Sequence, residues 1–177
     1  MNWKTCRRIA ALTSLAVLCT FSGCGIYSFT GVAITAETME IQTFYNDAEG
    51  GPPDLAQTFT NELRDYFLQN TNLTLVQQDG ELIMEGAVIG YKLSPVAPVA
   101  GGNQNQVDYS DLTRLTITVQ VSYTNTTDET FNFENKRFSF FEDFNSDQNL
   151  VTIENQLIER IYDQIILDIF NASVANW

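Results

Sequence analysis

The side chain best placed for a chemical modification is the thiol of Cys24, which follows the small residues Ser22 and Gly23. A basic stretch over residues 4–8 opens the chain, and an apolar stretch follows from about residue 9 to residue 21. That apolar stretch is too short to cross about 30 Å of hydrocarbon, but it has the length of a secretory signal. The pattern therefore predicts a signal peptide over residues 1–23.

The order of basic residues, apolar residues, small residues and cysteine resembles the lipobox of bacterial lipoproteins. The resemblance implies a diacylglyceryl group on the Cys24 thiol, cleavage before it, and acylation of the new amino terminus. Phe21 stands where that motif usually has leucine. We expect a lipidated N-terminus and tether over residues 24–36. A plain signal peptide cleaved near Cys24 and a buried N-terminal helix are the alternatives.

Other chemistry is limited by which side chains the rest of the chain contains. Histidine is absent, and Cys6 and Cys19 would leave with the signal peptide, which excludes most nucleophile–base pairs and zinc sites. The neighbouring carboxylates Glu81/Glu85 and Glu142/Asp143 could do acid–base work, but 22 acidic residues make such pairs common by chance. We predict a protein that is not an enzyme, with no catalytic residue, no metal ligand and no cofactor beyond the lipid.

Charge limits the partners of the chain. Residues 1–23 carry three of the nine basic residues and none of the 22 acidic ones, so the remaining chain has a formal charge near -16. Such a surface does not suit nucleic acid or an anionic membrane face, because both bind clustered cations. The length after the signal suits one domain, which we place at residues 37–177.

The first half of that domain shows both strand and helix periodicity. Residues 37–45 alternate, which predicts one strand with Met39, Ile41 and Tyr45 on one face and Phe44 on the other. Residues 54–69 carry apolar side chains at helical spacing, and Asp54 with Gln57 suggests a capping box.

Two further strands are predicted at residues 73–76 and 81–93, joined as a hairpin through the turn at residues 78–80. On the longer strand we expect the odd-numbered apolar residues, such as Ile83 and Tyr91, to share one face. Residues 94–111 hold prolines, glycines and amides and predict a long loop, which either contacts a partner or is disordered.

The clearest strand spans residues 115–123, with its odd-numbered apolar residues facing inward. A turn leads to a strand over residues 130–144, in which the phenylalanines change parity, so we predict a bulge near Asn135. Six phenylalanines in this strand exceed what one covered face can bury. Core packing explains most of them, and some could lie on a partner-binding surface.

A final helix is predicted from a start between Asp147 and Thr152 to about Val174, with isoleucines along one stripe. Two helices with one apolar face each, and one sheet, imply an α+β two-layer sandwich. We expect a mixed or antiparallel sheet of about four to five strands with both helices on one face.

Several segments of this chain, in this order, resemble the lipopolysaccharide-assembly lipoprotein family (LptE), in the form found in Bacteroidetes-type bacteria. They are Cys24 to Gly31, Leu73 to Val76, Gly86, Gly90-Tyr91, Leu115 to Val119 and Asp168 to Trp177. The resemblance implies an outer-membrane lipoprotein on the periplasmic side, a partner and plug of the β-barrel translocon that inserts lipopolysaccharide into the outer leaflet.

The resemblance also implies contact with lipopolysaccharide itself through basic residues, for which Arg114, Lys136 and Arg137 are the candidates. An acidic surface would repel this anionic lipid unless the three cations cluster. The residues after the anchor, Gly25-Ile26, include no aspartate of the kind that resembles an inner-membrane retention signal. No acidic run that resembles a surface-export signal follows Cys24 either, and both absences favour the periplasmic leaflet of the outer membrane. The alternative function is a different periplasmic lipoprotein module that binds another component of the cell envelope.

Overall fold

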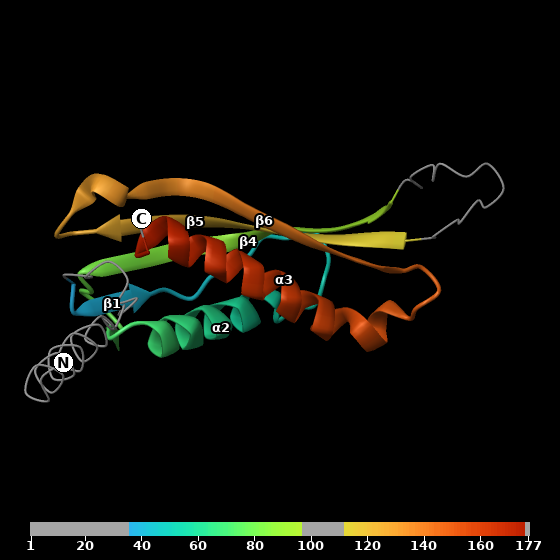
Figure 1. Cartoon of the computed structure of the whole chain (residues 1–177), viewed down its shortest axis with the longest axis horizontal. Helices are drawn as coiled ribbons and strands as arrows, with labels where there is room; N and C mark the ends of the chain where they lie inside the picture. The colour runs from blue at the N-terminus through green and yellow to red at the C-terminus, as the bar shows by residue number, and fades with distance from the viewer. Residues whose placement is uncertain (1–35, 97–111, 176–177) are drawn as a thin grey trace, which may run out of the picture. The chain divides into compact units, whose positions relative to one another are not determined.

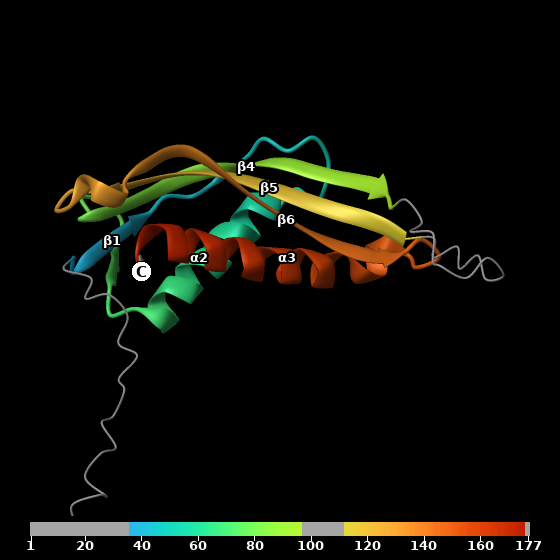
Figure 2. The same ribbon diagram turned by 45° about the horizontal axis from the view of Figure 1, so that its top comes forward.

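Two helices cover one face of a six-stranded mixed sheet in this computed structural model, which describes residues 36–96 and 112–175 (Figures 1 and 2). This confirms the predicted α+β two-layer sandwich, although the sheet has more strands than expected. The elements are β1 (Thr38–Ile41), β2 (Tyr45–Asn46), α2 (Leu55–Asn70), β3 (Thr74–Val76), β4 (Leu82–Pro95), β5 (Leu112–Asn125), the 3₁₀ turn η1 (Glu129–Phe131), β6 (Phe133–Asn145) and α3 (Leu150–Ser173).

The predicted strand over residues 37–45 is in fact two short strands, β1 and β2, and this prediction was wrong. Phe44 turns into the core and is 3% exposed, whereas Tyr45 is 72% exposed. Helix α2 supports the break, because the Thr60 hydroxyl accepts a hydrogen bond from the Phe44 amide at 3.1 Å. The Arg64 guanidinium donates to the Ile41 carbonyl at 2.6 Å. Side chains of a distant helix thus replace the strand hydrogen bonds that alternation alone predicted.

Strands β3 and β4 do not form the predicted hairpin. Both run parallel to β1 and lie on either side of it, in the sheet order β3-β1-β4-β5-β6. The connection crosses β1 at Gly80, where an added Cβ would lie 2.5 Å from the Glu40 amide nitrogen. Next to it the Glu81 carboxylate accepts a hydrogen bond from the Glu37 amide at 2.6 Å. Glycine is needed here because no side chain fits between the two backbones.

At its start, strand β4 buries the face opposite to the one that we predicted. Leu82, Met84 and Val88 are fully buried against the helices, and Ile83 lies on the other side. An irregularity between Val88 and Gly90 then shifts the parity. Tyr91 therefore returns to the helix side, where its hydroxyl donates to Glu154 of α3 at 2.5 Å.

The long hairpins agree better with the sequence. The odd-numbered apolar residues of β5 are buried as predicted, from Leu115 to Tyr123. The bulge in β6 is also confirmed, because Asn135 has a φ of 52° and the β5–β6 register shifts beside it. Strand pairing reaches closer to the loop than expected, since β4 continues to Pro95 and β5 begins at Leu112. Residues 97–111, the rest of the predicted loop, lie outside the described residues.

Both helices occupy the predicted ranges, and their apolar stripes meet in the core. The ring of Phe59 lies 5.0 Å from the ring of Phe44 and 5.0 Å from that of Tyr162, centroid to centroid. The Asn149 side chain caps α3 by accepting from the Val151 amide at 3.1 Å. The predicted capping box on α2 was wrong, because the side chain of Asp54 makes no capping hydrogen bond.

Candidate functional site

The predicted lipidation site Cys24 lies outside the described residues, as do the signal peptide and all but the last residue of the predicted tether. These remain predictions. Among the described residues, no helix has the length and apolar character required to cross a membrane.

The uncovered face of the sheet carries Arg114 in a fixed position. Its guanidinium donates two hydrogen bonds to the opposite Asp143 of β6, Nε to Oδ1 at 2.7 Å and Nη2 to Oδ2 at 2.9 Å. The same guanidinium lies 3.6 Å from the centroid of the Phe141 ring. The hydrogen bond from Arg114 holds the pKa of Asp143 below its usual range. Arg114 is thus paired within the chain and partly neutralised.

Lys136 and Arg137 lie on opposite faces of β6, because they are consecutive residues of a strand. Arg137 is opposite Gln120 on the uncovered face, about 20 Å along the strands from Arg114. Lys136 lies on the helix side, with its amino group 5.1 Å from the centre of the Phe133 ring. The structure does not bring the three predicted cations into one cluster, and their role as contacts stays a prediction.

Sequence reasoning missed one cation of the uncovered face, Lys92. Lys92 pairs with Thr116 of β5, and Ser94 pairs with Arg114, so the two cations are diagonal neighbours on the same face. The parity shift in β4 hid this position, because strict alternation through residues 81–93 assigns the wrong face to part of the strand. No sequence signal marks the shift apart from Gly90 beside it.

Much of this face on β5 and β6 is small and polar. Thr118 and Ser139 share a hydrogen bond across β5 and β6 at 3.0 Å, and Gln120 donates to Asn135 at 2.9 Å. The positive side chains here are Lys92, Arg114 and Arg137, and the acidic ones are Glu85, Glu134 and Asp143. We call this surface, made by β4, β5 and β6 away from the helices, the open sheet face. It is close to neutral in a strongly acidic protein.

The carboxylate pairs considered for acid–base chemistry are engaged elsewhere. Glu81 binds backbone amides at the start of β1, as described above. Glu142 lies 3.5 Å from Arg160 of α3, and Asp143 binds Arg114. These contacts give Glu81, Glu142 and Asp143 structural roles, and Glu85, opposite Ser122, lies on the open sheet face. Within the described ranges no cluster of side chains could hold a metal ion.

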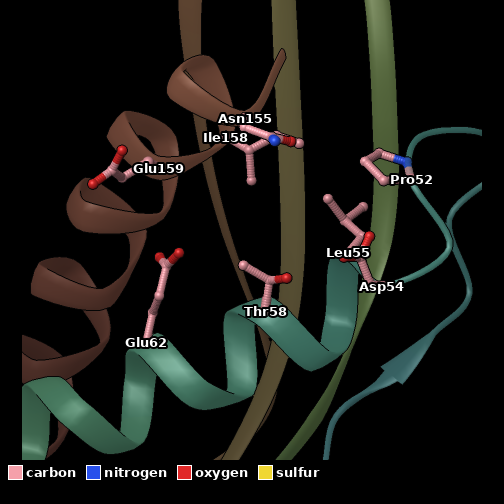
Figure 3. Close-up of a pocket in the computed structure, with 8 residues that line it drawn as sticks. All are labelled: Pro52, Asp54, Leu55, Thr58, Glu62, Asn155, Ile158 and Glu159. Atoms are coloured by element: carbon pink, nitrogen blue, oxygen red, sulfur yellow. The ribbon is translucent and has the colours of Figure 1, made fainter. Parts of the chain in front are cut away.

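A cavity of about 270 Å³ lies between the first turns of α2 and the facing part of α3 (Figure 3). Its lining is acidic and polar in part: Pro52, Asp54, Leu55, Thr58, Glu62, Asn155, Ile158 and Glu159. Glu62 projects from α2 toward α3 (Figure 3), and its Oε2 atom is buried without a hydrogen-bond partner. Burial, followed by repulsion from Asp163 and Glu159, raises the pKa of Glu62 to about 7. The cavity thus contains a carboxyl group that is less stable when charged.

We expect Glu62→Gln to stabilise the protein at alkaline pH. The folded state binds the Glu62 proton more tightly than the unfolded state, so stability falls as pH rises from about 4.5 to about 7. The amide has no proton to lose, and thermal unfolding of the variant should be less sensitive to pH over this window and occur at higher temperature at pH 8. Glu129→Gln, on the exposed η1 turn, is the matched control. A steeper pH dependence in Glu62→Gln than in the parent would contradict this expectation.

No curated protein matches the chain. Among solved structures it is similar to the hypothetical protein CT253 from Chlamydia trachomatis, at 8% identity and a TM-score of 0.53, over 77% of this chain and 97% of that chain. This likeness concerns the fold alone. Uncharacterized lipoprotein B from Nitrosomonas europaea has 15% identity and a TM-score of 0.46, over 76% of this chain and 79% of that chain.

A minor lipoprotein from Acinetobacter baumannii has 13% identity and a TM-score of 0.42, over 76% of this chain and 89% of that chain. At the level of sequence families, the model described as LptE, lipopolysaccharide-assembly, matches residues 36–173. That range includes every helix and strand of the described structure.

Proposed function

Because this chain belongs to the lipopolysaccharide-assembly family LptE, we propose that it is a lipid-anchored partner of the β-barrel translocon that inserts lipopolysaccharide into the outer leaflet. The observation that carries the proposal is the family match over residues 36–173, which takes in the whole sheet and both helices. The protein acts by binding and assembly and not by catalysis. The structural contacts of Glu81, Glu142 and Asp143 support the absence of catalysis in this proposal.

The anchor of the proposed protein is the acylated Cys24 on the periplasmic side of the outer membrane. Two or three acyl chains hold a protein stably, whereas one chain binds only marginally. The tether over residues 24–36 is short, since its 13 residues reach only about 45 Å when fully extended. The folded domain therefore stays next to the membrane in which its barrel partner sits.

We assign the contact with the barrel to the open sheet face. The interior of an outer-membrane barrel is polar and wet, so a plug must present polar groups whose hydrogen bonds are satisfied. The side chains of Thr118, Ser139 and Gln120 meet that requirement, and this face has balanced charges. The helix side is less suitable, because α3 presents Glu159, Asp163 and other acids.

The test is recovery of the affinity-tagged full chain from detergent-solubilised outer membranes. We expect a β-barrel protein of large mass in stoichiometric amount, and we expect the level of that barrel to fall when this lipoprotein is depleted. A Cys24→Ala chain should be lost from the outer-membrane fraction, because it cannot be acylated. Recovery of the lipoprotein alone, with unchanged lipopolysaccharide on the cell surface, would instead favour an envelope-binding module of another kind.

A further inference from the structure

Strand β6 is the long edge strand of the sheet formed by the described residues. The opposite edge strand, β3, has three residues, whereas β6 has 13. Within residues 36–96 and 112–175, no backbone hydrogen bond joins β6 to any strand other than β5. An edge of this length presents a row of unpaired amides and carbonyls, which is a template for another strand.

The two parts of this edge differ in how well they resist pairing. Near its start, the bulge at Asn135 interrupts the regular geometry, and bulges are a common way to protect an edge. After the bulge the strand is regular. It reads Lys136-Arg137, then the uncharged segment Phe138 to Phe141, then Glu142-Asp143. The regular part thus has a basic end, an aromatic middle and an acidic end.

We propose that this part of β6 pairs with β6 of a second copy of the chain, antiparallel, about a twofold axis at Ser139. The charge pattern selects the partner and the direction. Antiparallel self-pairing brings the basic end of each strand to the acidic end of the other, whereas parallel pairing places like charges side by side, which is unfavourable. The sequence that complements this edge is therefore its own.

On each face of the sheet, this register places complementary side chains opposite each other. With Ser139 at the axis, Lys136 of one copy is opposite Glu142 of the other, and both lie on the helix side, since they pair with Val121 and Leu115 of β5. Glu142 would then be shared between this Lys136 and Arg160 of its own copy, which lies 3.5 Å away. Phe138 is opposite Phe140 on the same side. On the open sheet face Arg137 is opposite Phe141, whose ring is 42% exposed. Cation–aromatic and aromatic–aromatic pairs are favourable across strands.

The geometry leaves the open sheet face uncovered in the dimer, because the contact uses the edge of the sheet. A twofold axis perpendicular to the sheet keeps both pairs of helices on one side and continues the sheet across the axis. The inference goes beyond the proposed function and does not depend on it. Failure to find a barrel partner would leave it unchanged.

A charge-swap experiment on the full chain, purified in detergent, tests the pairing by analytical ultracentrifugation. We expect the parent chain to dimerise. In Lys136→Glu and in Glu142→Lys, each symmetric contact becomes a like-charge pair, so each variant alone should dissociate about tenfold more readily. An equimolar mixture of the two variants restores opposite charges at both contacts and should recover the parent affinity. Circular dichroism checks that both variants fold.

Disulfide trapping tests the register. Ser139→Cys should form a covalent dimer under mild oxidation, because the two cysteines face each other at the axis, where the Cβ atoms can approach to about 4.5 Å, the long end of the disulfide range. Val151→Cys, 83% exposed on α3, is the matched control and should form no covalent dimer. A monomeric parent chain, a mixture that fails to dimerise, or equal trapping of both cysteines would overturn the proposal. Trapping of Ser139→Cys to a different protein in intact cells would also overturn it.

Discussion

Phe59→Ala lowers the free energy of unfolding by about 3–5 kcal/mol, the range for removing a large aromatic side chain from a packed core. Phe59 is fully buried and makes edge-to-face contacts with both Phe44 and Tyr162. It therefore joins α2 to the break between β1 and β2 and to α3. Alanine would leave a cavity where these three elements meet.

Urea unfolding followed by circular dichroism measures this loss. Phe131→Ala is the control, because Phe131 is 44% exposed on the η1 turn and its truncation should change stability by less than about 0.5 kcal/mol. Removing the Phe59 ring should also loosen the packing of α2 against α3, and so change the cavity around Glu62. Similar effects of the two substitutions would show that Phe59 is not at the centre of the core.

Gly86→Ala destabilises the protein by about 3 kcal/mol, the upper part of the usual range for overpacking. An added Cβ at Gly86 would lie 2.1 Å from the carbonyl oxygen of Gln120 and 2.6 Å from the ring of Phe44. The first atom belongs to the backbone of β5, so relief requires the two central strands to move apart. The second belongs to the Phe44 ring, which is buried in the core.

The matched control is Gly90→Ala on the same strand. There the nearest atom to an added Cβ is the Thr118 Cβ at 3.3 Å, a contact that a small shift can relieve. We expect Gly90→Ala to cost less than about 1 kcal/mol, since only a small adjustment is required. Thermal unfolding of both variants distinguishes the two positions. An equal loss at Gly86 and Gly90 would contradict the close approach of β4 and β5 at Gln120.

Local patterns predicted the elements whose neighbours in space are also close in sequence. Helices α2 and α3 follow from apolar side chains at helical spacing, and strand β5 follows from strict alternation. The bulge at Asn135 followed from the change of parity among the phenylalanines of β6. In each case the signal lies within the element itself, so no distant contact was needed to recognise it.

The two errors of strand pairing share one cause, which is dependence on a distant part of the chain. The strand over residues 37–45 breaks because Thr60 and Arg64 of α2 bind its backbone. The hairpin between β3 and β4 is absent because β1 lies between them. Both are choices of hydrogen-bonding partner, and periodicity carries no information about partners.

The candidate surfaces also combine features that the sequence predicted with features that depend on distant contacts. The sequence identified Arg114, Lys136 and Arg137 as cations on strands, but only the structure shows that Arg114 pairs with Asp143 and that Lys136 faces the helices. Lys92 was missed because a parity shift in β4 determines its face. Glu62 was missed because its burial depends on how α2 and α3 pack.

The sequence by itself determined the element types, the two-layer class, the family and the acidic, histidine-free composition that leaves little room for catalysis. Those properties depend on residue type and on spacing within one element. Only the tertiary structure decided the strand order, the face on which each charge lies, the half-buried Glu62 and the position of β6 as the long edge strand of the described sheet. These depend on which distant segments meet, because backbone and side-chain groups can satisfy their hydrogen bonds with many partners and packing selects among them.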